Sequence, residues 1–153
     1  TKPGRFLIRN ICMIFDRYHH HIDTIIPKLK EGVTVVADRD FLSTLAYSAG
    51  DDIPWQPLLA AHEEILGDAF IMPDLLFLID VPVKVGIART MVKQSGKKDY
   101  FDTETMLTTI RDRYREVSSS PVIADNTTVI TIDGNASPKN AHDEIWRYMR
   151  VSS

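Results

Sequence analysis

Three absences narrow the possibilities before any motif is considered. The 153 residues include one cysteine, Cys12, so the chain cannot form an internal disulfide. No apolar run approaches the roughly 20 residues that a bilayer-spanning helix needs, and the first residues show no signal-peptide pattern. Positive charge is not in excess either, because the formal net charge is −3, which argues against a dedicated nucleic-acid binder. We therefore expect a cytoplasmic protein that binds neither membranes nor nucleic acid.

The sequence does contain enough apolar material for one globular domain. Hydrophobic residues make up 44% and charged residues 25% of the chain, a balance that allows a core to be buried. The spacing of apolar residues predicts helices at 11–31 (bent or interrupted at Pro27), 41–49, 55–70, 83–94, 103–117 and 138–150, and strands at 33–37, 75–81 and 127–133. Apolar strands that alternate with helices indicate an α/β fold with a parallel sheet covered on both faces.

The segment VTVVADRD, residues 33–40, carries the most information. It predicts a buried strand that delivers Asp38 and Arg39 to the carboxyl edge of a sheet, where open α/β folds bind ligands. Ser43, Thr44 and Tyr47 follow on the next helix, and helix-terminal donors together with a planar guanidinium suit a phosphate. The plain alternative is an Asp-Arg pair that caps a helix or bridges two loops.

Several further motifs occur in an order that resembles the thymidylate kinase family. They are DR with a histidine at 16–20, P-x-L-x-x-G at 27–32, DR followed by ST and AY at 38–47, PDL to DV at 73–81, SGKKDYFD at 95–102, R-x-R-Y-x-E at 111–116 and a strand ending in ID at 132–133. The resemblance covers nearly the whole chain from about residue 12. It implies a three-layer P-loop kinase fold with a LID at about 93–103, and phosphoryl transfer from ATP to dTMP with Mg²⁺. It also implies a homodimer paired through helices, for which the apolar face of helix 11–31 is a candidate.

The same resemblance assigns roles on the acceptor side. Arg39 would hold the acceptor monophosphate, and Asp38 would orient Arg39 or reach a magnesium-bound water. Ser43 belongs to the same substrate-binding motif. Thr44 would face the pyrimidine base, and Tyr47, on the same helical face, would pack on the deoxyribose.

Two residues of the first helix would complete the base pocket. Arg17 resembles the arginine that donates to a thymine carbonyl; seen alone, it could equally be a surface arginine paired with a neighbour. Met13 stands where the family commonly has a phenylalanine that stacks on the base, and methionine packs against a ring less specifically. The strictness of the preference for thymine therefore stays open.

On the donor side, the resemblance places Lys97 and Lys98 in the LID as catalytic cations, with a solvated basic loop as the alternative. Arg89, Gly134 and Asn135 would bind the adenine of ATP. Two further arginines, Arg111 and Arg113, are expected to lie on an exposed helix, although a place beside the LID is the other possibility. The histidine run 19–21 does not predict a metal site, because neighbouring helical residues point about 100° apart; a solvated or interfacial face is favoured.

One motif of the family is missing. P-loop kinases cradle phosphates with G-x-x-x-x-G-K-[ST] between the first strand and the first helix, and these 153 residues contain no such sequence. We expect the sequence to be a subset of a longer polypeptide that includes this loop. The alternatives are a non-catalytic nucleotide-binding relative that has lost it, or, within enzymes, a deoxynucleoside kinase.

Overall fold

The structure is a computed structural model that describes residues 2–93 and 103–151. It comprises two compact units, residues 1–72 (unit 1) and residues 73–153 (unit 2). In the described part of the chain, no helix combines the length and the apolar character that crossing a membrane requires. The expected α/β character is confirmed, with helices in the majority and one parallel sheet.

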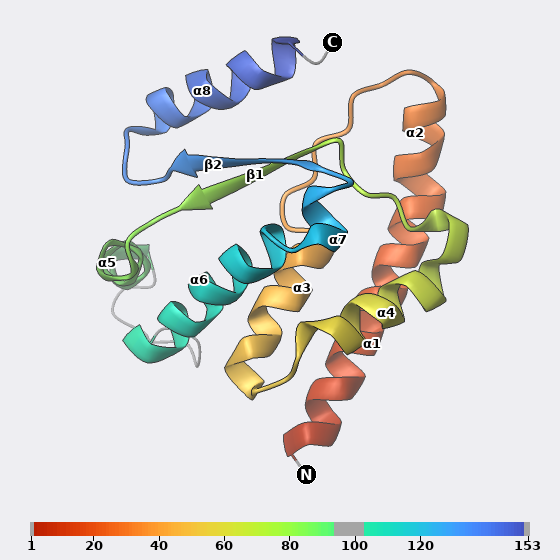
Figure 1. The fold of residues 1–153 in the computed structure, drawn as a ribbon, viewed down its shortest axis with the longest axis horizontal. Helices are drawn as coiled ribbons and strands as arrows, with labels where there is room; N and C mark the ends of the chain where they lie inside the picture. Colours follow the sequence, from red (N-terminus) through yellow and green to blue (C-terminus); the bar gives the residue numbers. More distant parts are fainter. Residues whose placement is uncertain (1, 94–102, 152–153) are drawn as a thin grey trace. The chain divides into compact units, whose positions relative to one another are not determined.

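The regular secondary structure described in unit 1 is helical, and loops connect the helices (Figure 1). Its elements are α1 (Lys2–His20), the π-helical η1 (His21–Ile25), α2 (Ile26–Lys30), α3 (Phe41–Tyr47), the 3-10 turns η2 (Ser48–Asp51) and η3 (Gly67–Ala69), and α4 (Trp55–Leu66). Helix α4 packs against both α1 and α3. The core between these helices is formed by apolar side chains that are almost fully buried, namely Ile14, Phe41, Leu45, Ala46, Leu58 and Leu59.

The predicted helix 11–31 forms, and it begins earlier than expected, at Lys2. It runs on past Pro27 as one rod because a π turn, η1, ends two residues before that proline. Proline has no N–H to donate to the carbonyl four residues back, and the wider π turn removes the need for that bond. The π turn also holds His21 in the interior of unit 1, with 2% of its surface exposed.

The predicted apolar face of this helix is only partly buried. Ile14 and Ile25 are in the core, whereas apolar residues at seven-residue spacing remain exposed: Ile8 (64%), Phe15 (51%), Ile22 (40%) and Leu29 (40%). A seven-residue repeat of apolar residues is the spacing that pairs helices along a seam.

The prediction of a strand at residues 33–37 is wrong. None of these residues is in a strand, and Val33 and Val36 are 45% and 78% exposed. A strand needs a neighbour for its N–H and C=O groups, and in the described residues the sheet contains only the two strands of unit 2. Asp38 and Arg39 therefore stand in a loop that leads into α3, not at the end of a strand.

Unit 2 contains the sheet. Its elements are β1 (Leu75–Asp80), α5 (Val83–Lys93), α6 (Glu104–Ser118), α7 (Pro121–Ala124), β2 (Thr128–Asp133) and α8 (Pro138–Val151). All of them except the short α7 were predicted from the sequence to within a few residues. The two strands run parallel, with Leu75 opposite Thr128 and Asp80 opposite Asp133. The carboxyl ends of both strands therefore lie at one edge and each ends in an aspartate.

Side-chain hydrogen bonds cap the N-termini of α6 and α8 in unit 2. Thr103 accepts a hydrogen bond from the backbone N–H of Met106 at 3.2 Å, and Ser137 accepts one from Asn140 at 3.2 Å. Such N-caps satisfy backbone donors that have no partner within the helix. The predicted cap at Ser137, with Pro138 as the first helical residue, is confirmed.

Candidate functional site

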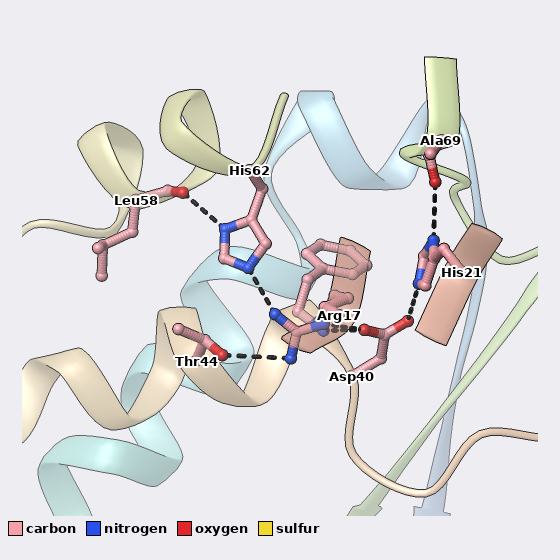
Figure 2. Close-up of polar contacts among 8 residues, drawn as sticks. Arg17, His21, Asp40, Thr44, Leu58, His62 and Ala69 are labelled. Atoms are coloured by element: carbon pink, nitrogen blue, oxygen red, sulfur yellow. Dashed lines mark hydrogen bonds and ion pairs between the residues drawn. The ribbon is translucent and has the colours of Figure 1, made fainter. Parts of the chain in front are cut away.

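Arg17 is the centre of a polar cluster that joins the three main helices of unit 1 (Figure 2). Its Nη1 donates to Nε2 of His62 at 2.7 Å, and its Nη2 donates to Oγ1 of Thr44 at 3.4 Å. Its Nε forms an ion pair with Oδ1 of Asp40. The Arg17 side chain is only 10% exposed, so this guanidinium is held within the unit, and the surface-arginine alternative is wrong.

His62 acts as a neutral acceptor in this cluster. Its Nδ1 lies 2.7 Å from the carbonyl oxygen of Leu58, and because a carbonyl can only accept, the proton of the ring is on Nδ1. Nε2 is then free of hydrogen and accepts from Arg17. Burial lowers the pKa of His62 to about 4, opposed by the Leu58 carbonyl and assisted by the charge of Arg17, so the ring is uncharged at neutral pH.

Asp40 connects Arg17 to a second buried histidine. Its Oδ1 accepts from the backbone N–H of Phe41 at 2.7 Å, which caps α3. Its Oδ2 lies 3.4 Å from Nε2 of His21, a distance and geometry that suit an ion pair rather than a hydrogen bond. Nδ1 of His21 donates to the carbonyl oxygen of Ala69 at 2.8 Å.

The two ionisable groups of this pair shift in opposite directions. The contact with Asp40 raises the pKa of His21 above 6.5, and burial opposes that shift. Burial raises the pKa of Asp40, but His21, Arg17 and the Phe41 amide together outweigh it and bring the pKa below 3.8. Asp40 is therefore ionised at neutral pH, and its one negative charge faces both Arg17 and His21.

Sequence reasoning did not select Asp40, His21 or His62. Asp40 carries a detectable signal, because an aspartate directly before an apolar helical run is a preferred N-cap. His21 was expected on a solvated or interfacial face, and it is buried instead. His62 is one polar residue on the buried face of α4, and no sequence pattern distinguishes it from a core histidine.

The residues predicted to bind the acceptor all lie in unit 1. Thr44 is buried beside Arg17, and Met13 lies one helical turn before Arg17 with 43% of its surface exposed. Arg39 has a left-handed backbone (φ 60°), and its guanidinium carbon lies 5.3 Å from the centre of the Tyr47 ring. This is a cation–π distance, so two predicted site residues meet directly.

The start of α3 differs from the expected phosphate site. Ser43 lies in the first turn and Asp38 is exposed in the preceding loop. The carboxylate of Asp40 takes up the Phe41 N–H that was expected to serve a phosphate. The cations of this region, rather than the end of the helix, are consequently the groups able to hold an anion.

In unit 2, the three residues predicted to bind adenine lie together. Nη1 of Arg89, on α5, donates to the carbonyl oxygen of Gly134 at 2.8 Å, just after β2. The N–H of Gly134 donates to the Asp80 carbonyl at 2.8 Å, and the N–H of Asn135 donates to Oδ1 of Asp133 at 2.8 Å. The Arg89 contact therefore ties α5 to the loop at the carboxyl edge of the sheet.

Asp80 holds two arginines at that same edge. Arg111 binds it with two hydrogen bonds, Nε to Oδ1 at 2.6 Å and Nη2 to Oδ2 at 2.9 Å, and Nη2 of Arg115 donates to Oδ2 at 2.6 Å. The Arg111 contact, against a smaller opposing effect of burial, lowers the pKa of Asp80 to about 2. The expectation that Arg111 merely decorates an exposed helix is wrong, because its side chain is 30% exposed and bidentate.

The LID prediction, including Lys97 and Lys98, falls almost entirely outside the described residues. Within the described ranges, no group of three or more histidine, cysteine, aspartate or glutamate side chains is arranged to hold a metal ion. These residues consequently do not fit a magnesium site built from protein ligands alone.

Comparison of this chain with known sequences identifies its family. A sequence model of the family described as thymidylate kinase matches residues 4–145. The chain belongs to the thymidylate kinase family. Among its relatives, a thymidylate kinase of Nitrobacter hamburgensis is 35% identical over 137 residues, which cover 85% of this chain and 56% of that protein. One of Rhodopseudomonas palustris is 32% identical over 134 residues (86% and 56%), and one of Bradyrhizobium diazoefficiens is 30% identical over 135 (85% and 57%).

The chain thus spans just over half the length of these relatives. The family resemblance drawn from the motifs is confirmed. The roles of individual residues remain predictions, because the comparisons align the chain without testing any side chain.

Proposed function

We propose that this protein is an ATP:dTMP phosphotransferase and that unit 1 provides its acceptor site. The observation that carries the proposal is the contact of Arg17 with Thr44 in the interior of unit 1. These are the two positions at which the family resemblance assigns recognition of the pyrimidine. A guanidinium offers donors only, so it suits the carbonyl oxygens of thymine.

The neighbouring residues would bind the remainder of dTMP. Arg39 would hold the monophosphate, with Asp38 orienting it and Ser43 in the same motif, and Tyr47 would pack on the deoxyribose. Met13 would contact the face of the base. The left-handed backbone at Arg39 supports this role, because such strain in a residue other than glycine often occurs at binding sites.

The donor side of the reaction would be formed by residues of unit 2. Arg89, Gly134 and Asn135 would contact the adenine of ATP, and Lys97 and Lys98 would bring positive charge from the LID. Phosphoryl transfer depends chiefly on positioning and on cations around the transferred group. Mg²⁺ would neutralise phosphate charge when bound. Among the described residues, no cluster of side chains forms a site for it.

The family also suggests the architecture and assembly. We infer a three-layer P-loop kinase fold in which both units belong to one domain, and a homodimer formed through the continuous helical segment α1, η1 and α2. The exposed apolar residues at positions 8, 15, 22 and 29 support pairing through that segment.

The family match does not favour the alternative of a non-catalytic nucleotide-binding relative, because the relatives are called thymidylate kinases. A deoxynucleoside kinase is disfavoured because Arg39 suits an acceptor that already carries a phosphate.

Two measurements separate these functions. The first is calorimetric binding of dTMP, dUMP and thymidine to the protein, and the second is ADP release by the full-length protein with ATP and each acceptor. We expect dTMP to bind at least about tenfold more tightly than thymidine, since a charged hydrogen bond to phosphate is lost, and ADP release to require dTMP. Binding of dTMP without ADP release would favour the non-catalytic relative. Equal binding and turnover of thymidine would overturn the acceptor assignment.

A further inference from the structure

Arg17 is useful for reading a base only if its donors point in a fixed direction. A guanidinium has five N–H groups, and three of them are directed to Asp40, His62 and Thr44. The other two N–H groups, one on Nη1 and one on Nη2, are not used in these three contacts. Arginine side chains lose much rotamer freedom when they are fixed, so a site that fixes them beforehand avoids that loss at binding.

His62 is well suited to do the fixing. The ring is fully buried, and its Nδ1–H is engaged by the Leu58 carbonyl one turn earlier in α4, which directs the bare Nε2 at Arg17 (Figure 2). A neutral acceptor orients the guanidinium without cancelling its charge. Asp40, by contrast, divides its charge between Arg17 and His21.

We propose that His62 is a positioning residue of the acceptor site, which holds Arg17 so that its two remaining N–H groups select a pyrimidine with a carbonyl at position 4 over one with an amino group. Thymine and uracil carry an acceptor at that position, whereas cytosine carries a donor. A fixed donor facing another donor leaves both unsatisfied, which is an effective way to reject a ligand. The proposal rests on the acceptor function proposed above.

Three substitutions separate this role from a merely structural one. In His62→Gln, the side-chain oxygen can reach the position of Nε2 and accept from Arg17. In His62→Asn, the shorter amide can replace only the contact of Nδ1 with Leu58. His62→Leu retains bulk and makes neither contact, and His20→Asn, at an exposed histidine of α1, is the control.

The readout is calorimetric affinity for dTMP and for dCMP, with thermal unfolding of each variant. We expect dTMP affinity to fall about tenfold in the Asn and Leu variants and by less than about threefold in the Gln variant. Affinity for dCMP should stay constant or rise, so the preference for dTMP narrows. If the Asn variant binds like the wild type, or the Gln and Asn variants lose affinity equally, the positioning role is refuted.

One measurement needs no variant. ¹⁵N NMR of the histidine rings should show His62 neutral at pH 7, with the proton on Nδ1, both with and without dTMP. A proton on Nε2 would contradict the proposal. Failure of the wild-type protein to bind dTMP would overturn the acceptor function itself, whereas binding of dTMP that is indifferent to His62 would overturn only the inference drawn here.

Discussion

Nε2 of His21 lies 3.4 Å from Oδ2 of Asp40, and this ion pair connects the π turn after α1 with the first residue before α3. The histidine is 2% exposed and the carboxylate also contacts Arg17. Both partners have shifted pKa values, raised for His21 and lowered for Asp40. The stability of unit 1 should consequently depend on pH in a predictable direction.

The first prediction concerns that dependence. A raised histidine pKa contributes stability that is complete below about pH 6.5 and disappears as pH rises through the folded-state pKa. A lowered aspartate pKa contributes stability above about pH 4, which disappears as pH falls through the folded-state value. We therefore expect the pair to stabilise the fold most between about pH 4 and pH 6.5, and urea unfolding across pH 4–8 would measure it.

The matched variants are His21→Asn and His20→Asn. Asparagine at position 21 can still donate to the Ala69 carbonyl, so only the titrating contact with Asp40 is lost. Relative to the wild type, His21→Asn should cost the most unfolding free energy near pH 6 and progressively less towards pH 8, whereas His20→Asn should cost little at either pH. A cost of His21→Asn that does not change with pH would show that the ion pair does not titrate in this range.

The second prediction concerns Asp80. Replacing it with asparagine removes the charge that binds Arg111 and Arg115, and we expect a loss of about 1–2 kcal/mol at pH 7, part of it screened by solvent. Because the pKa of Asp80 is lowered to about 2, the wild-type advantage should disappear as pH falls from about 4 towards 2. Arg115→Ala is the comparison, and its cost should be smaller because that side chain is 50% exposed. A larger cost at Arg115 than at Asp80 would reject the arrangement.

The third prediction uses two glycines of unit 2. A Cβ added at Gly134 would lie 2.4 Å from Cγ2 of Val81 and 3.0 Å from the Asp80 carbonyl oxygen, so Gly134→Ala should destabilise by about 1–3 kcal/mol. At Gly86, inside α5, an added Cβ meets nothing within 4 Å. Gly86→Ala should therefore stabilise by about 0.5–1 kcal/mol through helix propensity. Denaturant midpoints of the two variants on opposite sides of the wild type would bear this out.

The fourth prediction separates binding from stability at Arg39. Glycine adopts the left-handed backbone of this residue without strain, while the contact with Tyr47 is lost. These effects oppose each other, so Arg39→Gly should unfold within about 0.5 kcal/mol of the wild type, and Arg39→Ala should be the less stable of the two. Both should bind dTMP at least about tenfold more weakly. Wild-type affinity in either would remove Arg39 from the phosphate.

Most helices and both strands of unit 2 could be predicted from the sequence because their apolar residues repeat at helical or strand spacing. The prediction failed at segment 33–37, since VTVVA has the composition of a strand but pairs with no other strand among the described residues. Strand formation depends on a partner for backbone hydrogen bonds, which composition does not supply. The sequence also placed residues 38–47 in one site with Arg17, and Thr44 of that segment contacts Arg17.

The sequence by itself determined the family and the chemical types available, since motif order and spacing are properties of the chain. Only the tertiary structure decided which of those groups meet. Arg17 and His62 are 45 positions apart, and Asp80 and Arg111 are 31 apart. The protonation state of His62, the charge of Asp40 and the direction of the Arg17 donors all follow from burial and from partners that packing brings together. Electrostatic and hydrogen-bond energies depend on distance in space, and separation along the chain carries almost no information about that distance.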